Sequence, residues 1–242
     1  MIVYCVLKTG GCYNADYVKR LFLALARNIS FRCRCICLTD TTEDLYGWCD
    51  VIPLQHNWPG WWSKIELFRP DLPKEPAVYF DLDTVILGDI TDLLNIQVPF
   101  AVLEGFNQRA SAMKGNKNFA SGIMAGNFHL HSKVYKEFKK DPDKYMSYSY
   151  NKGREGDWRH GDQAFIAMML KDDAIKRVQD FLPRNFIVGK RVLKKQGIIP
   201  KEARVIAWSG EPRLHELFTF NGNVGFPQKL YREIDNHWRG HD

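Results

Sequence analysis

In the stretch AVYFDLDTVILGDI, residues 77–90, two aspartates only two residues apart, Asp81 and Asp83, have largely apolar runs on both sides. A continuous apolar run such as AVYF is typical of a strand that is covered on both faces of a parallel sheet. Open α/β sheets bind their ligands beyond the carboxyl ends of their strands. The pair therefore stands where such a sheet binds a ligand, and residues i and i+2 of an extended chain point the same way.

Two carboxylates in this arrangement repel each other unless a cation lies between or beside them. Like charges about 4 Å apart cost about 4 kcal/mol at an effective dielectric constant of about 20. A divalent cation turns this cost into binding, and oxygen ligands favour Mg²⁺ or Mn²⁺, which take further ligands from substrate phosphates. Asp81 and Asp83 are therefore predicted to bind a metal ion.

The pattern on both sides of this stretch predicts an α/β fold with a mixed, mostly parallel central sheet flanked by helices, because strands alternate with helices. Strands are predicted at 1–7, 33–40, 50–54, 77–83, 100–105, 121–130 and 204–210, and helices at 17–28, 61–72, 88–94, from 132, at 162–173 and at 227–238. The polar, pattern-free stretch 105–118 is predicted to be a mobile loop, with a possible role as a lid. No linker rich in Pro, Gly or Ser divides the chain, so a single domain is predicted.

Composition indicates a soluble globular protein, since 45% of the 242 residues are hydrophobic and 26% are charged. The longest apolar stretches have the length of strands, so no membrane span is predicted, and the start of the chain is interpreted as a strand rather than a signal peptide. Cys33, Cys35 and Cys37 alternate without Cys-x-x-Cys spacing, which favours reduced cysteines used as small apolar residues. Reduced cysteines predict a cytoplasmic location.

The net charge of +6 is spread along the chain, and the only dense basic cluster is GKRVLKKQG, residues 189–197. A nucleic-acid-binding protein is expected to interleave a basic stripe with exposed aromatic residues, so no nucleic-acid partner is predicted. A modest positive field suits a small anionic substrate such as a nucleotide.

The acidic pair has three interpretations. Asp81 could cap the following turn while Asp83 lies on the surface. FDLDTVI is also similar to the motif of haloacid-dehalogenase phosphatases, in which Asp81 would be the nucleophile; that motif normally ends the first strand, whereas here it ends about the fourth. The third interpretation is the DxD motif of a GT-A glycosyltransferase, in which the pair holds a metal ion against a sugar-nucleotide diphosphate.

The neighbouring segments favour the third interpretation. SKIELF, VYFDLDTVILGDITDLL, FASGIMAGN and GDQAFI follow one another in the order typical of one family. This order resembles the retaining glycosyltransferases of glycogenin and the bacterial lipopolysaccharide galactosyltransferases, glycosyltransferase family 8. The resemblance implies one GT-A domain over residues 1–242, with a nucleotide-binding part of about 1–104 and a donor-sugar and acceptor part of about 105–242.

The resemblance also implies roles for residues between 64 and 122. Asp81 would contact the ribose and the metal ion, and Asp83 the metal ion directly. Lys64 would reach a phosphate or sugar oxygen as a point charge. Ser121 and Gly122 would let the backbone approach the donor sugar, since glycine has no side chain in the way.

Further along the chain, Asp162 would bind donor hydroxyls and Gln163 would offer its amide oxygen to the developing positive charge at the anomeric carbon. Gly210 aligns with a family glycine, and Arg213 falls on a phosphate-binding lysine, whose role a bidentate guanidinium can take.

Three positions depart from the family pattern. Ala207 replaces the histidine that is the family's third metal ligand, and His215 is the hypothetical substitute. Ala120 replaces an asparagine that would contact the sugar, and Arg159 replaces an acidic residue. The tryptophans near the motifs are interpreted mainly as core residues rather than as an acceptor groove; they are Trp58, Trp61, Trp62, Trp158 and Trp208.

The resemblance therefore implies a transferase that uses Mn²⁺ or Mg²⁺ and moves a hexose, with UDP-hexose as the expected donor, to an acceptor hydroxyl with retention. The acceptor would be a carbohydrate, a lipid-linked sugar or a protein. Two alternatives stay open: a phosphohydrolase with Asp81 as nucleophile, and a nucleotide- or carbohydrate-binding module whose turnover is weakened, which Ala120 and Ala207 support.

Overall fold

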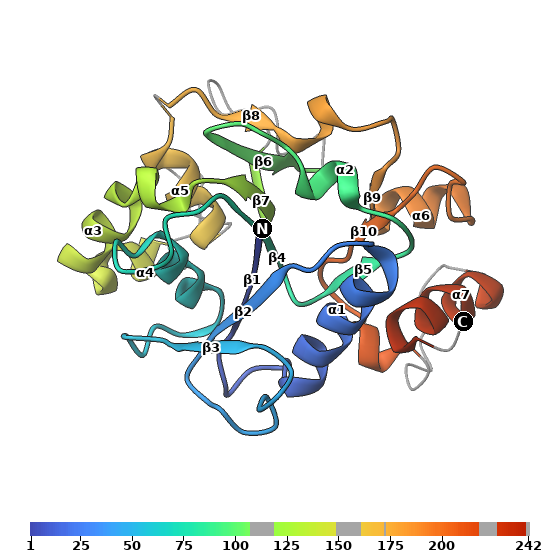
Figure 1. Cartoon of the computed structure of the whole chain (residues 1–242), viewed down its shortest axis with the longest axis horizontal. Helices are drawn as coiled ribbons and strands as arrows, with labels where there is room; N and C mark the ends of the chain where they lie inside the picture. Colours follow the sequence, from blue (N-terminus) through green and yellow to red (C-terminus); the bar gives the residue numbers. More distant parts are fainter. Residues whose placement is uncertain (107–118, 149–160, 172, 218–226, 241–242) are drawn as a thin grey trace.

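The fold was analysed in a computed structural model of the chain, which describes residues 1–106, 119–148, 161–171, 173–217 and 227–240 (Figure 1). The predicted mobile loop at 105–118 lies outside the described residues except for its first two. Arg159 and Trp158 lie outside them as well. No helix in these ranges combines the length and the apolar character needed to cross a bilayer.

A seven-stranded sheet forms the centre of the molecule. Its strands lie in the order β3 (Asp50–Pro53), β2 (Arg34–Thr39), β1 (Ile2–Leu7), β4 (Ala77–Phe80), β7 (Phe119–Gly126), β6 (Phe100–Glu104) and β8 (Lys176–Arg177). The first four strands of this order run parallel, β7 is antiparallel to both β4 and β6, and β8 is parallel to β6. The predicted α/β fold with a mixed, mostly parallel sheet is confirmed.

A second, three-stranded sheet continues from the first. It consists of β5 (Thr84–Ile86), β10 (Val205–Ala207) and β9 (Ile187–Gly189), with β10 in the middle. Only three residues, 81–83, separate β4 in the large sheet from β5 in the small one. The predicted strand 77–83 therefore ends early: β4 stops at Phe80, and the Thr84 N–H donates to the Asp81 carbonyl at 3.1 Å in a turn. Both aspartates thus lie where the two sheets meet, on a turn rather than on an extended strand.

The predicted helices are confirmed, with changes at their ends. They are α1 (Ala15–Asn28), the 3₁₀ helix η1 (Gly60–Phe68), α2 (Thr91–Leu94), α3 (Lys133–Lys140), α5 (Asp162–Met169) and α7 (Gln228–Arg239). A separate helix that was not predicted, α4 (Pro142–Tyr148), follows α3. The sequence did not predict β5, β8, β9, α6 (Lys190–Gln196) or the short 3₁₀ helices η3 (Phe128–His131), η5 (Val178–Phe181) and η6 (Leu214–Glu216). The basic cluster at 189–197 is α6 and its caps, and its dense charge masked the helix.

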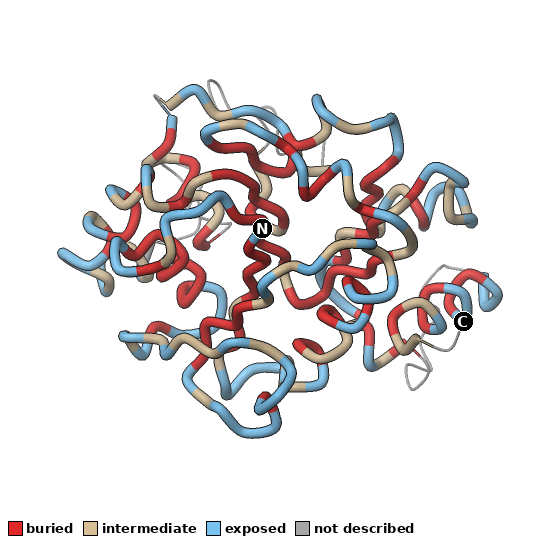
Figure 2. Tube along the Cα trace, in the orientation of Figure 1, coloured by how far each residue is buried: buried red, intermediate tan, exposed pale blue. Residues whose placement is uncertain are grey.

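Both faces of the large sheet are covered, as the apolar runs predict. Alternate residues of β1 belong to different cores: Val3 and Cys5 pack with α1 and the small sheet, whereas Ile2 and Tyr4 pack with η1, α3 and α5. Figure 1 shows α3, α4 and α5 on one side of the central strands and α1, α6 and α7 toward the other. In Figure 2 the central strands are buried and the outer turns of the helices are exposed. Two covered faces leave the carboxyl ends of the strands as the place for a site.

A buried ion pair attaches η1 to the end of β3. The Glu66 carboxylate is fully buried, accepts the N–H groups of Gln55 at 2.7 Å and His56 at 2.9 Å, and pairs with Arg69 at 3.0 Å. The same guanidinium group binds the exposed Asp71 side chain at 2.6 Å. Because η1 carries Lys64, this pair fixes the position of a predicted site residue.

We expect Glu66→Ala to lower the free energy of unfolding by about 3–5 kcal/mol. The variant removes the fully buried partner of Arg69, which keeps only Asp71 as an ion-pair partner, and it removes the acceptor of the Gln55 and His56 N–H groups. Asp71→Ala removes an exposed partner of the same arginine and is the matched control, with an expected loss of about 1 kcal/mol or less. Urea unfolding measures both losses. Equal losses in the two variants would contradict this assignment.

Candidate functional site

The ammonium group of Lys64 joins three separate elements at one point. It lies 2.9 Å from Asp81 Oδ1, at the end of β4, and 3.1 Å from Asp162 Oδ2, at the start of α5. It also donates to Ser121 Oγ, on β7, at 3.1 Å. Lys64, Ser121 and Asp162 are buried, whereas the Asp81 side chain is 34% exposed. The cluster is therefore closed below and open to solvent at Asp81.

The antiparallel pairing of β7 with β4 brings Ser121 and Gly122 to this cluster. Phe80 lies opposite Ile123, and the next N–H, that of Asp81, donates to the Gly122 carbonyl at 2.8 Å. On the other edge of β7 the pairing with β6 jumps between adjacent β6 residues from Met124 to Ala120. This irregularity leaves residues 121–123 without β6 partners at the site, where bulges commonly redirect side chains.

Two glycines permit the close packing at the site. A Cβ on Gly122 would lie 3.2 Å from Asp81 Oδ2. Gly161 has φ +55°, in the region that favours glycine, and a Cβ there would lie 2.2 Å from Trp61 Nε1. A side chain at position 161 would therefore displace the Trp61 indole from its place against the residue that precedes Asp162.

Asp162 and Gln163 both contact Ser121. The Ser121 hydroxyl donates to Asp162 Oδ2 at 2.9 Å, and the Ser121 N–H donates to Gln163 Oε1 at 3.3 Å. The two residues predicted to act on the donor sugar thus start α5 directly against the irregular part of β7. Six of the predicted site residues therefore lie together in the structure: Lys64, Asp81, Ser121, Gly122, Asp162 and Gln163.

Asp83 faces a second group of side chains. The Tyr13 hydroxyl donates to Asp83 Oδ2 at 2.8 Å and accepts from Arg213 Nη1 at 2.8 Å, and Arg213 lies 3.6 Å from the same carboxylate oxygen. Tyr13 was not predicted to be a site residue. Its signal is its place in the loop KTGGCYN, directly after β1, because the loops at the carboxyl ends of parallel strands line such sites.

The carboxylates at the junction resist being charged together. Burial and the neighbouring charge of Asp81 raise the pKa of Asp83 to about 7. Burial also raises the pKa of Asp162, although the Lys64 charge opposes this shift. For Lys64 burial favours the neutral form, but the charges of Asp162 and Asp81 outweigh it and raise its pKa above the ordinary value. Burial thus favours the neutral forms of Asp83 and Asp162, and further positive charge near them would favour their charged forms.

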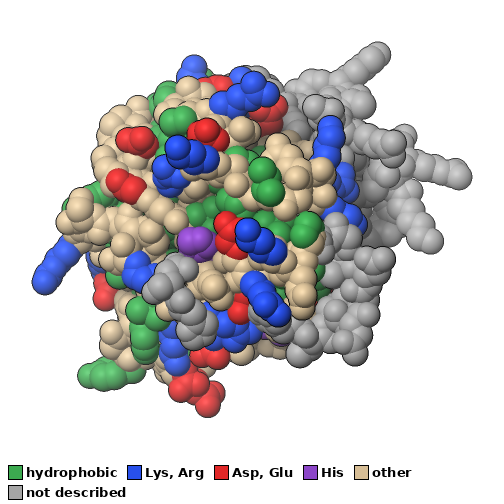
Figure 3. Space-filling model, turned by 90° about the vertical axis from the view of Figure 1, so that its right-hand side faces the viewer, with side chains coloured by type: hydrophobic (Ala, Val, Ile, Leu, Met, Phe, Trp, Pro, Cys, Tyr) green, Lys and Arg blue, Asp and Glu red, His purple; other side chains and the backbone are tan. Residues whose placement is uncertain are grey.

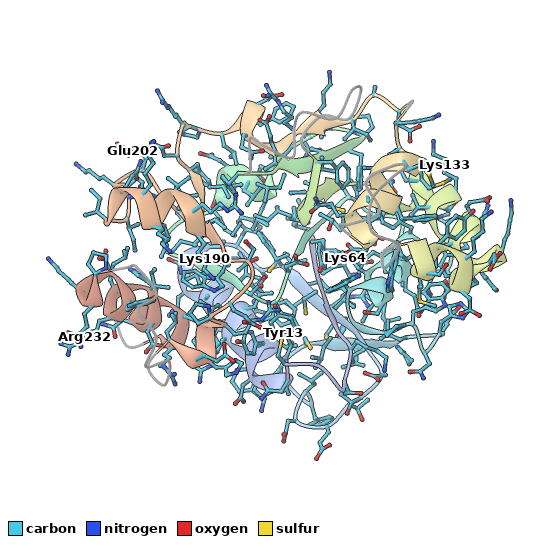
Figure 4. The ribbon with its side chains drawn as sticks, turned by 180° about the vertical axis from the view of Figure 1, so that it is seen from behind. Tyr13, Lys64, Lys133, Lys190, Glu202 and Arg232 are labelled. Carbon is cyan, nitrogen blue, oxygen red and sulfur yellow. The ribbon has the colours of Figure 1, made fainter. Side chains whose placement is uncertain are left out.

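The loop that carries Gly210 and Arg213 is attached to α6. Lys190, the first residue of α6, donates to the carbonyl oxygens of Ser209 at 3.1 Å and Glu211, and its ammonium group lies 4.7 Å from the ring centroid of Trp208. Burial and the Arg213 charge lower the pKa of Lys190 to about 8. In Figure 4 the labelled side chains of Lys190, Tyr13 and Lys64 lie around one central region, although they come from separate parts of the chain.

Gly210 has φ +70° and open space where a Cβ would be. It therefore lies on the loop beside Arg213, without a contact that assigns it to the Lys64 cluster.

His215 is not brought to the aspartates as a third ligand. Its Nδ1 is hydrogen-bonded to the Tyr17 hydroxyl at 2.7 Å, and the Glu216 carboxylate accepts the Arg213 N–H at 2.6 Å, which fixes the turn of η6. Among the described residues, no three His, Cys, Asp or Glu side chains form a group that could hold a metal ion.

The register of the small sheet shows where the third metal ligand implied by the resemblance would lie. Ala207 pairs with Thr84, the residue after Asp83. A histidine at position 207 would start from the strand beside the acidic pair, whereas the methyl group of alanine cannot coordinate a metal. The position implied by the resemblance is therefore adjacent to the site, but its ligand is absent.

The strand order, the antiparallel β7 and the acidic pair at the sheet junction define the GT-A glycosyltransferase fold. Three solved structures show this likeness. The glycosyltransferase GlyE of Streptococcus pneumoniae TIGR4 is 18% identical with a TM-score of 0.60, and the match covers 99% of this chain and 63% of that one. The chain thus spans less than two thirds of the length of GlyE.

The galactosyltransferase LgtC, solved in complex with donor and acceptor sugar analogs, is 12% identical with a TM-score of 0.57, and the match covers 99% of both chains. The bifunctional glycosyltransferase WbbM is 12% identical with a TM-score of 0.55 over 96% of this chain and 51% of that one. No protein-family model matches the sequence, and no curated protein matches it significantly.

We expect Lys64→Met to lower the free energy of unfolding by about 3–5 kcal/mol at pH 8, because two carboxylates lose their shared cation. The loss should be smaller at pH 5. Without Lys64 the pKa of Asp162 in the folded protein rises further above its pKa in the unfolded chain. The stability of the variant therefore declines as the pH rises from the unfolded-state pKa to the folded-state pKa of Asp162. Urea unfolding at both pH values measures this difference.

Lys133→Met is the matched control, since Lys133 lies at the rim in Figure 4 and forms an ion pair with the Asp173 carboxylate near the surface. Its expected loss is about 1 kcal/mol or less at either pH. A Lys64→Met loss that is the same at pH 5 and pH 8 would contradict the charge-compensating role of Lys64.

Proposed function

We propose that this protein is a nucleotide-sugar glycosyltransferase that transfers a hexose to an acceptor hydroxyl. The observation that carries the proposal is the contact of Lys64 with Asp81 and Asp162 at the carboxyl end of β4, with Asp83 and Arg213 directly beside it. Carboxylates and cations on both sides of one junction suit a substrate that joins a diphosphate to a sugar. The GT-A fold agrees with this assignment.

Asp81 and Asp83 fit a divalent cation, with Mn²⁺ or Mg²⁺ as the proposed ions. Both donate hard oxygen atoms, and a cation would offset the burial and the neighbouring Asp81 charge that together raise the pKa of Asp83 to about 7. Lys64 and Tyr79 bind Asp81 Oδ1, and no described residue forms a hydrogen bond with its Oδ2. When bound, such an ion stabilises the charge that builds on a departing diphosphate.

Arg213 and Lys64 would bind the negatively charged part of the donor. Arg213 lies next to Asp83 with its side chain 27% exposed, so its guanidinium group can reach a phosphate from solvent. Lys64 lies at the bottom of the cluster and would offer its charge to a phosphate or sugar oxygen. Two cations placed before the reaction cost no reorganisation when the leaving group becomes charged.

Asp162, Gln163, Ser121 and Gly122 would bind the donor sugar. Asp162 would accept from sugar hydroxyls, while the Gln163 amide oxygen would face the anomeric carbon. Gly122, beside Asp81, leaves room for the sugar ring to approach the backbone. In this arrangement the diphosphate lies toward Arg213 and the sugar toward Asp162.

The proposed donor is UDP-hexose and the proposed outcome at the anomeric carbon is retention, as the resemblance implies. The acceptor would be a carbohydrate, a lipid-linked sugar or a protein. The phosphohydrolase alternative is less well supported, because β4, which precedes the acidic pair, is the fourth strand along the chain and not the first. A binding module with weakened turnover is favoured by Ala207, which stands beside the acidic pair without a ligand.

We expect UDP at about 100 times its dissociation constant to raise the melting temperature by about 5–10 °C in the presence of Mn²⁺. Asp83→Asn should lose most of this rise, because one oxygen donor with negative charge is replaced by an amide. EDTA should have the same effect on the wild type. Differential scanning fluorimetry with UDP, GDP and their hexose derivatives measures the shifts.

Asp92→Asn is the control for this experiment, since Asp92 is an exposed aspartate in the first turn of α2. It should keep the whole rise in melting temperature. If no nucleotide diphosphate stabilises the wild type, the proposed function is wrong.

Asp162→Asn should slow release of UDP from the preferred sugar nucleotide by about 10²–10³-fold, because the negative charge next to the reacting sugar is lost. UDP affinity should change much less, since the diphosphate lies toward Arg213. Single-turnover kinetics and calorimetric titration separate the two effects. Asp143→Asn, at an exposed position of α4, is the control.

An equal loss of UDP affinity and rate in Asp162→Asn would contradict the assignment of this residue to the sugar. UDP binding by the wild type, combined with neither hydrolysis nor transfer, would instead favour the binding module.

A further inference from the structure

Trp61 differs from the tryptophans near it in its exposure. Trp58, Trp62 and Trp208 are buried, with 6%, 3% and 3% of their surfaces exposed, which confirms the interpretation of these three as core residues. Trp61 is 57% exposed. The core interpretation is therefore wrong for Trp61, which places a large aromatic surface in solvent.

The geometry of η1 places Trp61 directly beyond Lys64. Residues i and i+3 of a 3₁₀ helix are eclipsed, so these two side chains leave the same face of η1, one turn apart. Lys64 is buried and points to Asp81 and Asp162, whereas Trp61 is exposed. Lys64 thus lies at the bottom of the site and Trp61 at its rim.

Gly161 confirms that Trp61 lies at the site. The indole nitrogen would be 2.2 Å from a Cβ on Gly161, so the ring packs against the backbone of the residue that precedes Asp162. The glycine, with φ +55°, leaves the space that the indole occupies. An exposed aromatic ring is therefore held next to the residue assigned to the donor sugar.

We infer that Trp61 binds the acceptor, and that the acceptor presents a hexopyranose ring which stacks on the indole. This inference rests on the proposed glycosyltransferase function. A pyranose ring has an apolar face of C–H groups and a polar edge, and an exposed indole pairs with the face while leaving the hydroxyls free. A ring so placed brings a hydroxyl near the donor sugar.

The order of groups along the site assigns Trp61 to the acceptor and not to the donor. Arg213, Tyr13 and Asp83 form one end, Asp81 the middle, and Lys64 with Asp162 the other end. A donor whose diphosphate lies at the first end places its sugar at Asp162. Trp61 lies past that position, where the second sugar must enter.

The first test observes Trp61 directly. The seven tryptophans give seven indole ¹H–¹⁵N signals, and Trp61→Phe assigns the Trp61 signal because it removes that signal alone. With UDP and Mn²⁺ present, the wild type is titrated with methyl glycosides of glucose, galactose, mannose and N-acetylglucosamine. At least one glycoside should shift the Trp61 signal with a saturable curve, and mannitol, an open-chain polyol, should not.

The second test compares variants by affinity for the glycoside that shifts the signal, measured by saturation-transfer NMR. Trp61→Ala should weaken binding about tenfold, whereas Trp61→Phe, which keeps an aromatic face, should stay within about threefold of the wild type. Trp48→Ala is the matched control, because Trp48 is 42% exposed in the segment before β3 and should bind like the wild type.

The inference is overturned if no glycoside shifts the Trp61 signal, or if Trp61→Ala binds the glycoside as tightly as Trp48→Ala. The rise in melting temperature with UDP and Mn²⁺ is measured on the same samples. If that rise is present in the wild type while Trp61 does not respond to glycosides, the acceptor site is wrong and the proposed transferase stands. If the rise is absent, the transferase itself is wrong, and the acceptor inference falls with it.

Discussion

The ion pairs of Lys64 with Asp81 and Asp162 are the interaction on which the site depends. One ammonium group, almost fully buried, compensates two carboxylates that come from different elements, and Ser121 completes its contacts. Burying such a group without partners would cost several kcal/mol, so the packing of η1 against β4, β7 and α5 and the arrangement of the charges require each other. Since the compensation is incomplete, the carboxylates keep a capacity for further positive charge from Arg213 or a metal ion.

The position of this cluster follows from how the two sheets are joined. A turn of three residues connects β4 to β5, so the acidic pair cannot move away from the junction without breaking strand pairing. The reversed direction of β7 and its irregular pairing with β6 then place Ser121 and Gly122 beside Asp81. Figure 3 shows that the face over α6 and α7 carries basic, acidic and apolar side chains intermixed, without a continuous basic stripe. On this face, therefore, charges of both signs are dispersed rather than gathered into one patch.

The sequence was sufficient to predict the strands and helices with long apolar patterns, and it placed Lys64, Asp81 and Asp162 in one site through the order of their segments. It could not predict that β7 is antiparallel, since periodicity carries no direction, nor that residues 81–83 form a turn. Tyr13 was missed because its loop has no apolar pattern. Trp61 and Trp62 are the same residue type side by side in the sequence, and the packing of η1 against the core decides which of them is exposed and which is buried.

At position 207 the resemblance implies a histidine that binds the metal ion, but the residue is alanine. The proposed metal site at the junction of the two sheets would therefore lack this ligand. The side chains nearest Asp83 supply positive charge instead: Arg213 lies 3.6 Å from its carboxylate and is bridged to it by Tyr13. Lys190 binds carbonyl oxygens of the loop that precedes Arg213, and this contact fixes the position of the Arg213 guanidinium group beside Asp83. A fixed cation cannot replace a metal ligand, but it reduces the charge that the metal must neutralise on the diphosphate. In the proposed transferase, a weaker metal site would then be compatible with transfer, because Arg213 and Lys64 would share with the metal ion the stabilisation of the leaving group.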